Sequence, residues 1–168
     1  MGYIHDTSMS QFIPPNVMHC VTGVWTDIAG QVAGTIARHK AAAAETSIVN
    51  IPITIPSNSV ALKGSYLKSV EIDYEVLIAA CTSVTAALTK VVRGIDGAVA
   101  VVSAPVVTQD LAAAVAAATV DQHKLTVTVT TPEWIDNDAY FLLKLTVVAA
   151  ATTTFDLLGA VANFTLRI

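Results

Sequence analysis

Apolar and polar residues alternate along much of the chain, and the alternation is most regular between Tyr66 and Leu77. In that segment every second residue is apolar and the residues between them are acidic: Val70, Ile72, Tyr74 and Val76 against Glu71, Asp73 and Glu75. A period of two is that of a β-strand with one face buried and the other in water. The segment therefore predicts an antiparallel strand with a row of carboxylates on its solvent face.

Six more segments predict strands: Ser47–Ile55, Val84–Arg93, Ala98–Val107, His123–Thr131, Tyr140–Ala149 and Leu157–Ile168. Proline cannot donate a hydrogen bond to a strand ladder, so Pro52 and Pro56 restrict the first of these to a sheet edge or a bulged strand. Gly94–Gly97 predicts a hairpin turn, and Pro56–Ser59 predicts a second turn. The chain is therefore expected to be all-β, an antiparallel β-sandwich or jelly roll of seven or eight strands.

Three segments show no clear period. Residues 25–44 predict irregular structure that leads into a strand, although the block Ala41–Ala44 also allows a short helix. Leu111–Ala118 is too short for a stable isolated helix and is expected to form a loop or a single helical turn. Residues 1–24 are polar and contain two adjacent prolines, so they predict an extended N-terminal arm. Residues 25–168 then form the β-sandwich domain.

The composition agrees with a β-fold. Valine, isoleucine and threonine make up one third of the 168 residues, and these β-branched side chains favour strands over helices. Hydrophobic residues make up 54% of the chain and charged residues 13%, which excludes a disordered charged tail and suits one domain with a sizeable core. The net charge is −4 and the nine basic residues are scattered, so we expect no nucleic-acid partner.

The sequence carries no visible export or membrane signal. The first basic residue is Arg38, so the chain is expected to lack a signal peptide. No apolar run reaches the ~18–20 residues that a membrane-spanning helix needs. Cys20 and Cys81 form no zinc or disulfide pattern, and we expect two free thiols packed in the core. A Cys20–Cys81 disulfide is the alternative.

Candidate catalytic groups do not form a recognisable motif. The four histidines, His5, His19, His39 and His123, have no metal-ligand spacing. His19 and Cys20 are adjacent, and neighbours on an extended chain point to opposite faces. The carboxylates between Tyr66 and Leu77 are interpreted as a solvated sheet face, with a general acid–base pair as the alternative. We therefore predict no enzyme, and no catalytic, cofactor-binding or metal-ligating residue.

Two further polar or aromatic features have structural interpretations. Asp136-Asn137-Asp138 offers several oxygen ligands, but it lacks the full pattern of an EF-hand calcium loop and is expected to form a polar turn. Trp134, just before it, is interpreted as an anchor in the core or at its rim, and a sugar-binding platform is the alternative.

Three stretches carry a resemblance to a known group of proteins: residues 55–64 (IPSNSVALKG), 131–138 (TPEWIDND) and 156–164 (DLLGAVANF). They resemble small uncharacterised proteins encoded by tailed bacteriophages and in viral metagenomes, which are taken to be virion structural proteins of the decoration or head-fibre type. The similarity covers residues 25–168 and leaves the arm outside. The resemblance implies a structural role on a virion and, as in many phage decoration and head-fibre proteins, a trimer.

The leading hypothesis is a virion structural protein that is made in the host cytoplasm and forms a homo-oligomer, with a trimer favoured. On this hypothesis the arm attaches to a neighbour or to other virion proteins such as the major capsid protein, and removal of residues 1–22 leaves a folded domain that no longer assembles. The alternative is a carbohydrate- or receptor-binding β-sandwich of a phage fibre, which predicts exposed rings among Trp25, Tyr66, Trp134 and Tyr140. A small hydrolase would need His, Asp and a nucleophile to converge. No membrane partner is expected.

Overall fold

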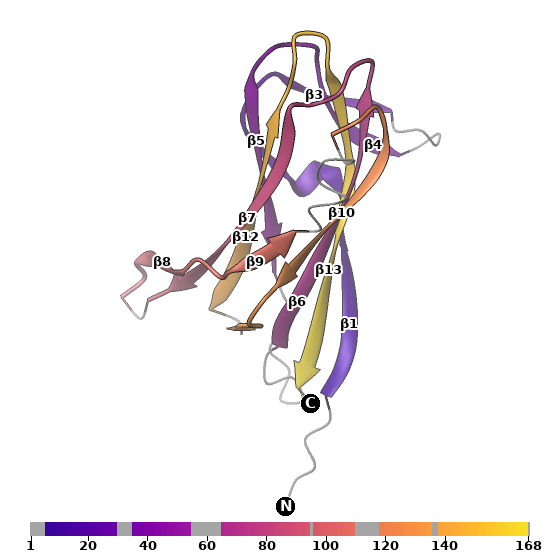
Figure 1. Cartoon of the computed structure of the whole chain (residues 1–168). Coiled ribbons are helices and arrows are strands. Elements are labelled where there is room, and N and C mark those ends of the chain that lie inside the picture. The colour runs from indigo at the N-terminus through magenta and orange to yellow at the C-terminus, as the bar shows by residue number, and fades with distance from the viewer. Residues whose placement is uncertain are drawn as a thin grey trace, which may run out of the picture.

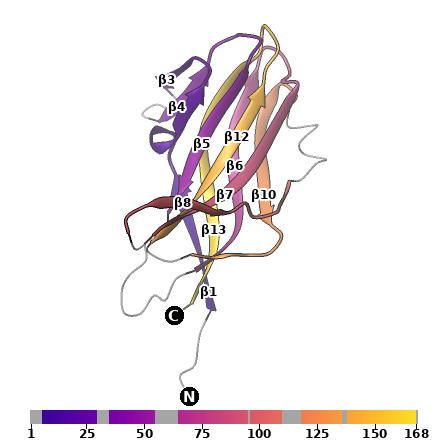
Figure 2. The same cartoon turned by 90° about the vertical axis from the view of Figure 1, so that its left-hand side faces the viewer.

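The computed structural model describes residues 6–29, 35–54, 65–94, 96–109, 118–135 and 138–167. Within them, thirteen strands form two sheets that pack face to face, and every strand pairing is antiparallel (Figures 1 and 2). The predicted all-β antiparallel sandwich is confirmed, with more strands than the seven or eight expected.

Sheet A has eight strands. Its main path runs in the order β3 (Trp25–Ala29), β4 (Ile36–Lys40), β13 (Thr154–Arg167), β6 (Ser65–Leu77), β10 (Asp121–Val129) and β9 (Val107–Gln109). Two strands lie off this path: β1 (Asp6–Ile13) pairs with β13, and β11 (Trp134–Ile135) pairs with β6.

Sheet B has five strands, in the order β2 (His19–Thr22), β5 (Thr46–Ile53), β12 (Ala139–Val148), β7 (Ser83–Arg93) and β8 (Val99–Ser103). A short 3-10 turn, η1 (Pro15–Val17), joins β1 of sheet A to β2 of sheet B. Gly94–Gly97 connects β7 to β8 as the predicted hairpin, with the Gly94 N–H donating to the Ala98 carbonyl at 2.7 Å. Pro56–Ser59, and Leu111–Ala118 apart from Ala118, lie outside the described residues.

The core fills the space between the inner faces of the two sheets. The clearest predicted strand is β6, and its apolar positions are buried as expected, while the acidic positions between them face outward. Its Tyr74 ring stacks on Phe155 of β13, with ring centroids 4.8 Å apart. Phe141 and Leu143 of β12 are completely buried and belong to the same core cluster. Both sheets therefore contribute alternate residues to one core, as a sandwich requires.

The prediction of one continuous strand over Ala98–Val107 is wrong, because the segment is divided between two strands. The chain forms β8 in sheet B, leaves that sheet at Ser103, and enters sheet A as β9. Pro105, which is buried, lies in the connection and cannot donate to a ladder. The continuous apolar pattern conceals this change of sheet, because residues on both sides of the crossing are valine-rich.

The prediction of irregular structure for residues 25–44 is also wrong, because β3 and β4 form there. The pattern was hidden because a buried position of β4 holds Lys40, which lies opposite Phe155 in the register. Residues 41–45, where a short helix was the alternative, contain no helix. A lysine at a core position removes the apolar alternation on which a strand prediction rests.

Most of the segment expected to be an arm takes part in both sheets. Residues 6–13 pair without interruption along β13, and residues 19–22 pair with β5. Between them, the chain crosses from sheet A to sheet B, with Ile13 and Met18 buried in the core. The Arg38 side chain holds this crossing by donating to the Pro15 carbonyl at 3.2 Å.

One glycine adapts β13 to two different neighbours on the same edge. β13 pairs with β4 through residues 155–157 and with β1 through residues 160–167, and its register to β6 shifts between Leu157 and Gly159. Gly159 has φ +156°, and a Cβ there would lie 2.7 Å from the Phe12 ring. The missing side chain therefore leaves room for Phe12 to lie across β13.

Deletion of residues 1–22 is expected to destabilise the fold, because it removes Ile13 and Met18 from the core along with β1 and β2. Full burial of one large apolar side chain contributes about 1.5–3 kcal/mol, so the deletion should cost more than about 3 kcal/mol. Urea unfolding of the two chains measures the difference. An unchanged unfolding midpoint would show that this segment packs as an independent arm.

Candidate functional site

The outer face of sheet A carries the carboxylates that the sequence singled out. Glu71, Asp73 and Glu75 project from β6, and Asp156 of β13 lies opposite Glu75 in the register. We call these four residues the acidic row. The three β6 carboxylates are half-buried and Asp156 is 7% exposed, so the row is more shielded than an open sheet face.

Basic and amide groups neutralise part of the acidic row. Lys124 Nζ lies 3.1 Å from Glu71 Oε2, and Asn163 Nδ2 donates to Glu71 Oε1 at 3.4 Å. His39 Nδ1 of β4 lies 2.5 Å from Asp156 Oδ1. These contacts join neighbouring strands of sheet A, and each therefore supports the ladder beneath it.

Asp73 has a different environment from Glu71. Partial burial raises its pKa, the negative charge of Glu71 raises it further, and Lys124 acts in the opposite direction. The two carboxylates thus differ in a way that their shared strand face did not predict. Within the described part of the chain, however, no three His, Cys, Asp or Glu side chains are placed to hold a metal ion.

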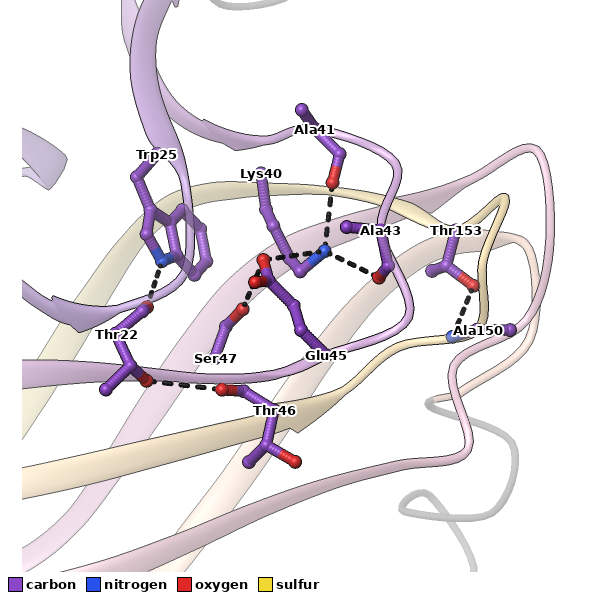
Figure 3. Close-up of polar contacts among 10 residues, drawn as sticks. All are labelled: Thr22, Trp25, Lys40, Ala41, Ala43, Glu45, Thr46, Ser47, Ala150 and Thr153. Atoms are coloured by element: carbon purple, nitrogen blue, oxygen red, sulfur yellow. Dashed lines mark hydrogen bonds and ion pairs between the residues drawn. The ribbon is translucent and has the colours of Figure 1, made fainter.

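A second polar cluster surrounds the buried Lys40 at one end of the sandwich (Figure 3). Its Nζ donates to the carbonyls of Ala41 at 2.9 Å and Ala43 at 3.2 Å, and lies 3.4 Å from Glu45 Oε1. Ser47 Oγ donates to the same carboxylate oxygen at 3.3 Å. We call this group the Lys40 cluster. It places a fully buried ammonium among oxygen acceptors, so it fixes the β4–β5 connection.

The remaining histidines lie apart from any catalytic partner that the described residues show. His19 is exposed, whereas Cys20 packs against the core, so these neighbours do point to opposite faces. His123 Nε2 lies 2.8 Å from the Thr119 carbonyl. His5 lies outside the described residues.

Both cysteines are free, which confirms the predicted thiols and excludes the disulfide alternative. Burial raises the pKa of the Cys81 thiol to about 11, with Lys40 acting in the opposite direction. Burial also raises the pKa of Cys20. Neither thiol is therefore activated as a nucleophile.

The aromatic rings proposed for carbohydrate binding have mixed exposure. Trp25 packs edge-on against Phe155, with its indole N–H donating to the Thr22 carbonyl at 2.9 Å. Tyr66 and Trp134 pack against each other with ring centroids 5.0 Å apart, and both are half-buried. Tyr140 is 36% exposed. Of the polar turn after Trp134, only Asp138 lies among the described residues, and its carbonyl accepts the Arg93 N–H.

The outer face of sheet B has a contrasting chemistry. Its outward positions alternate with the buried core positions of β5, β12 and β7. Ten of them form what we call the neutral face: Ile48, Asn50, Pro52, Leu142, Lys144, Thr146, Val148, Thr85, Ala87 and Thr89. Lys144 is the sole charged residue of these ten. The four apolar residues of β5 and β12 are half-buried in the isolated chain.

Comparison with protein-family models and with curated proteins finds no match to this chain. Among the described residues, no helix is long and apolar enough to cross a membrane.

Replacement of Lys40 by Met is expected to destabilise the protein by about 2–3 kcal/mol. This is below the 3–5 kcal/mol typical of a broken buried ion pair, because Glu45 keeps contact with water. Lys124→Met is the matched control: its ammonium is exposed, and loss of its pair with Glu71 should cost less than about 1 kcal/mol. Chemical denaturation compares them, and equal losses would contradict a structural role for the Lys40 cluster.

The raised pKa of Asp73 predicts a pH dependence of stability. The folded protein binds this proton up to a higher pH than the unfolded chain does, so stability is greatest below the ordinary carboxyl pKa of 3.8 and falls as pH rises through the raised value. Asp73→Asn removes that loss. The variant should match the wild type near pH 3 and exceed it near pH 7 by less than about 1 kcal/mol, since the carboxylate is partly solvated. Unfolding curves at both pH values test this, and a variant that loses stability at neutral pH contradicts it.

Proposed function

We propose that this protein is a virion structural subunit, which packs against copies of itself and against other virion proteins such as a major capsid protein. The observation that carries the proposal is the neutral face. Protein surfaces that stay in water rarely present a continuous area with so few charges, whereas the centres of protein–protein interfaces are depleted of charge. The isoleucine, leucine and valine side chains of this face offer apolar area that a neighbouring subunit can bury.

The contrast between the two outer faces supports an assembly in which sheet B faces a neighbouring subunit and sheet A faces water. The acidic row of sheet A holds four carboxylates and their partners, and its half-buried β6 carboxylates keep part of their surface in water. The neutral face of sheet B is suited to contact with a neighbour. Three copies related by a rotation axis bury such a face in a closed ring, which is the trimer that the virion resemblance favours.

In this proposal, residues 1–24 do not attach to a partner as a free arm. Because residues 6–13 belong to sheet A and Met18 belongs to the core, the described part of this segment offers a partner the outer edge of β1 and exposed side chains such as Phe12. In this proposal the segment contributes to assembly as a sheet edge.

A carbohydrate- or receptor-binding module is the second candidate. The observation in its favour is the edge-to-face contact between Tyr66 and Trp134, two half-buried rings on β6 and β11. A sugar-binding platform would need one of these rings to present its face to solvent. Glycan-array binding that is lost in Trp134→Ala but kept in Trp25→Ala would support this candidate over the structural subunit.

Charges placed on the neutral face are expected to prevent assembly. Native mass measurement of the wild type should give a multiple of the 17.5 kDa chain, with three favoured. Thr89→Glu with Thr146→Glu adds two carboxylates at outward positions and should weaken the association at least about tenfold, because an interface that buries unpaired charge loses affinity. Thr128→Glu, an exposed threonine of sheet A, is the matched control. A wild type that stays monomeric at all concentrations would overturn the proposal.

A further inference from the structure

We infer that β1 forms a second assembly contact, in which it pairs antiparallel with β1 of another copy about a two-fold axis and joins the two sheets A into one. This inference rests on the proposed function, since it names a surface through which the structural subunit associates. It differs in using a sheet edge, whereas the neutral face is the outer side of the other sheet.

The first observation is that β1 is an open and unprotected edge. It pairs with β13 on one side, and no strand of the described residues pairs with it on the other. Proteins commonly protect such edges with lysine, proline, bulges or short strands. β1 has eight residues in unbroken register, with no lysine, no proline and a single charge at Asp6. An unprotected edge of this length is a template for another strand.

The other edge strands of the described residues are protected. β11 has two residues and β9 has three, while β2 has four and β8 has five, each with a register shift to its neighbour. β3 has five residues and carries Asp27, which pairs with Arg38. β1 is therefore the exception.

The second observation is an apolar rim beside this edge. Phe12 is 59% exposed and Val17 is 49% exposed. A hollow of about 220 Å³ lies between β1 and β5, with Phe12, Val17 and Pro52 among its lining residues. A second hollow, of about 290 Å³, is lined in part by Phe12, Ile36 and Leu158. A strand added to β1 can thus gain backbone hydrogen bonds and bury apolar surface together.

The third observation concerns Gln11, whose Oε1 is buried and has no hydrogen-bond partner in the described structure. In a two-fold antiparallel pair the residues opposite each other lie on the same sheet face, so odd positions meet odd positions. A register centred on Met9 places Thr7 of the second copy opposite Gln11. When the Gln11 side chain turns toward the added strand, the threonine hydroxyl can donate to the amide oxygen that lacks a partner in the isolated chain, which makes a second copy of this chain a fitting occupant.

Charge is compatible with this pairing. The two Asp6 side chains lie at opposite ends of the paired strands, so they do not repel each other closely. The Glu71, Asp73 and Glu75 carboxylates on the two β6 strands are five strand spacings apart, about 24 Å at ~4.8 Å per strand. That distance is well beyond the Debye length of ~8 Å at physiological salt, so their repulsion is screened.

A two-fold contact at β1 and a ring contact at the neutral face use different surfaces, which border each other at Pro52. Combined, they link rings into a larger assembly, as a shell or a fibre base requires. Loss of the β1 contact should therefore leave the smaller ring intact.

The test uses charges on the outward positions of β1. Ser8→Lys with Ser10→Lys places like charges opposite each other across the two-fold axis, and should weaken the contact roughly tenfold or more. Ser8→Glu with Ser10→Glu should do the same. A one-to-one mixture of the two variants should restore the contact, because lysines then face glutamates. Thr128→Lys is the matched control, on a strand already paired on both sides.

Sedimentation equilibrium gives the association constants, and hydrogen exchange of the β1 amides locates the contact. The β1 amides should exchange more slowly in the concentrated wild type than in either charged variant. If the mixture associates no better than its components, or if exchange at β1 is independent of protein concentration, the inference is wrong. Failure of the proposed function is distinct: there the Thr89→Glu, Thr146→Glu variant assembles like the wild type while the β1 variants still lose their contact.

Discussion

The ladder between β6 and β13 is the constraint on which the rest of the sandwich depends. It runs along nearly the whole of both strands, and it brings Tyr74 and Phe155 into the stacked contact at the centre of the core. The free edge of β6 receives β10 and β11, while the free edge of β13 receives β4 and β1 one after the other. Two neighbours can share one edge because the backbone shifts at Gly159, where Phe12 occupies the space of a side chain. β1 is thereby tied to β13, so sheet A is complete only when β13 is in place.

The Lys40 cluster shows how a polar group can hold a core position. The lysine lies opposite Phe155, where an apolar residue would be expected, and its ammonium is satisfied by carbonyls of the loop that follows it. Nearby, a Cβ at Gly23 would lie 2.3 Å from Ser47 Oγ, so this position with φ +89° requires glycine. A few close polar contacts therefore fix the loop after Lys40, the start of β5 and the turn before β3. Apolar packing alone would leave these segments freer to shift.

Much of the fold could be predicted from the sequence, and the errors have identifiable causes. β6, β10 and β12 alternate because one face of each packs on the core, and β13 does so from Ala160 onward. The bounds of all four were predicted within a few residues. β1 and β4 were missed because Gln11 and Lys40 occupy inward positions, which breaks the alternation. The division of Ala98–Val107 between two sheets depends on contacts with distant strands, which a local pattern does not contain. The acidic row was visible in the sequence, but the different surroundings of Glu71 and Asp73 were not, since Lys124 and Asn163 come from neighbouring strands.

The proposed assembly rests on how charge is distributed over the two sheets. Most carboxylates that could keep a sheet face in water lie on sheet A, where Lys124 and His39 pair with them and limit their mutual repulsion. Lys144 is the sole charge of the neutral face of sheet B. The free-energy cost of removing this face from water is therefore small, and burial of its apolar side chains against a neighbour is favourable. β1 lies at the edge of the charged sheet, yet its own residues carry one charge in eight positions. In the proposed assembly, a subunit built in this way directs its neighbours to one face and one edge, while its acidic row lies on the opposite face.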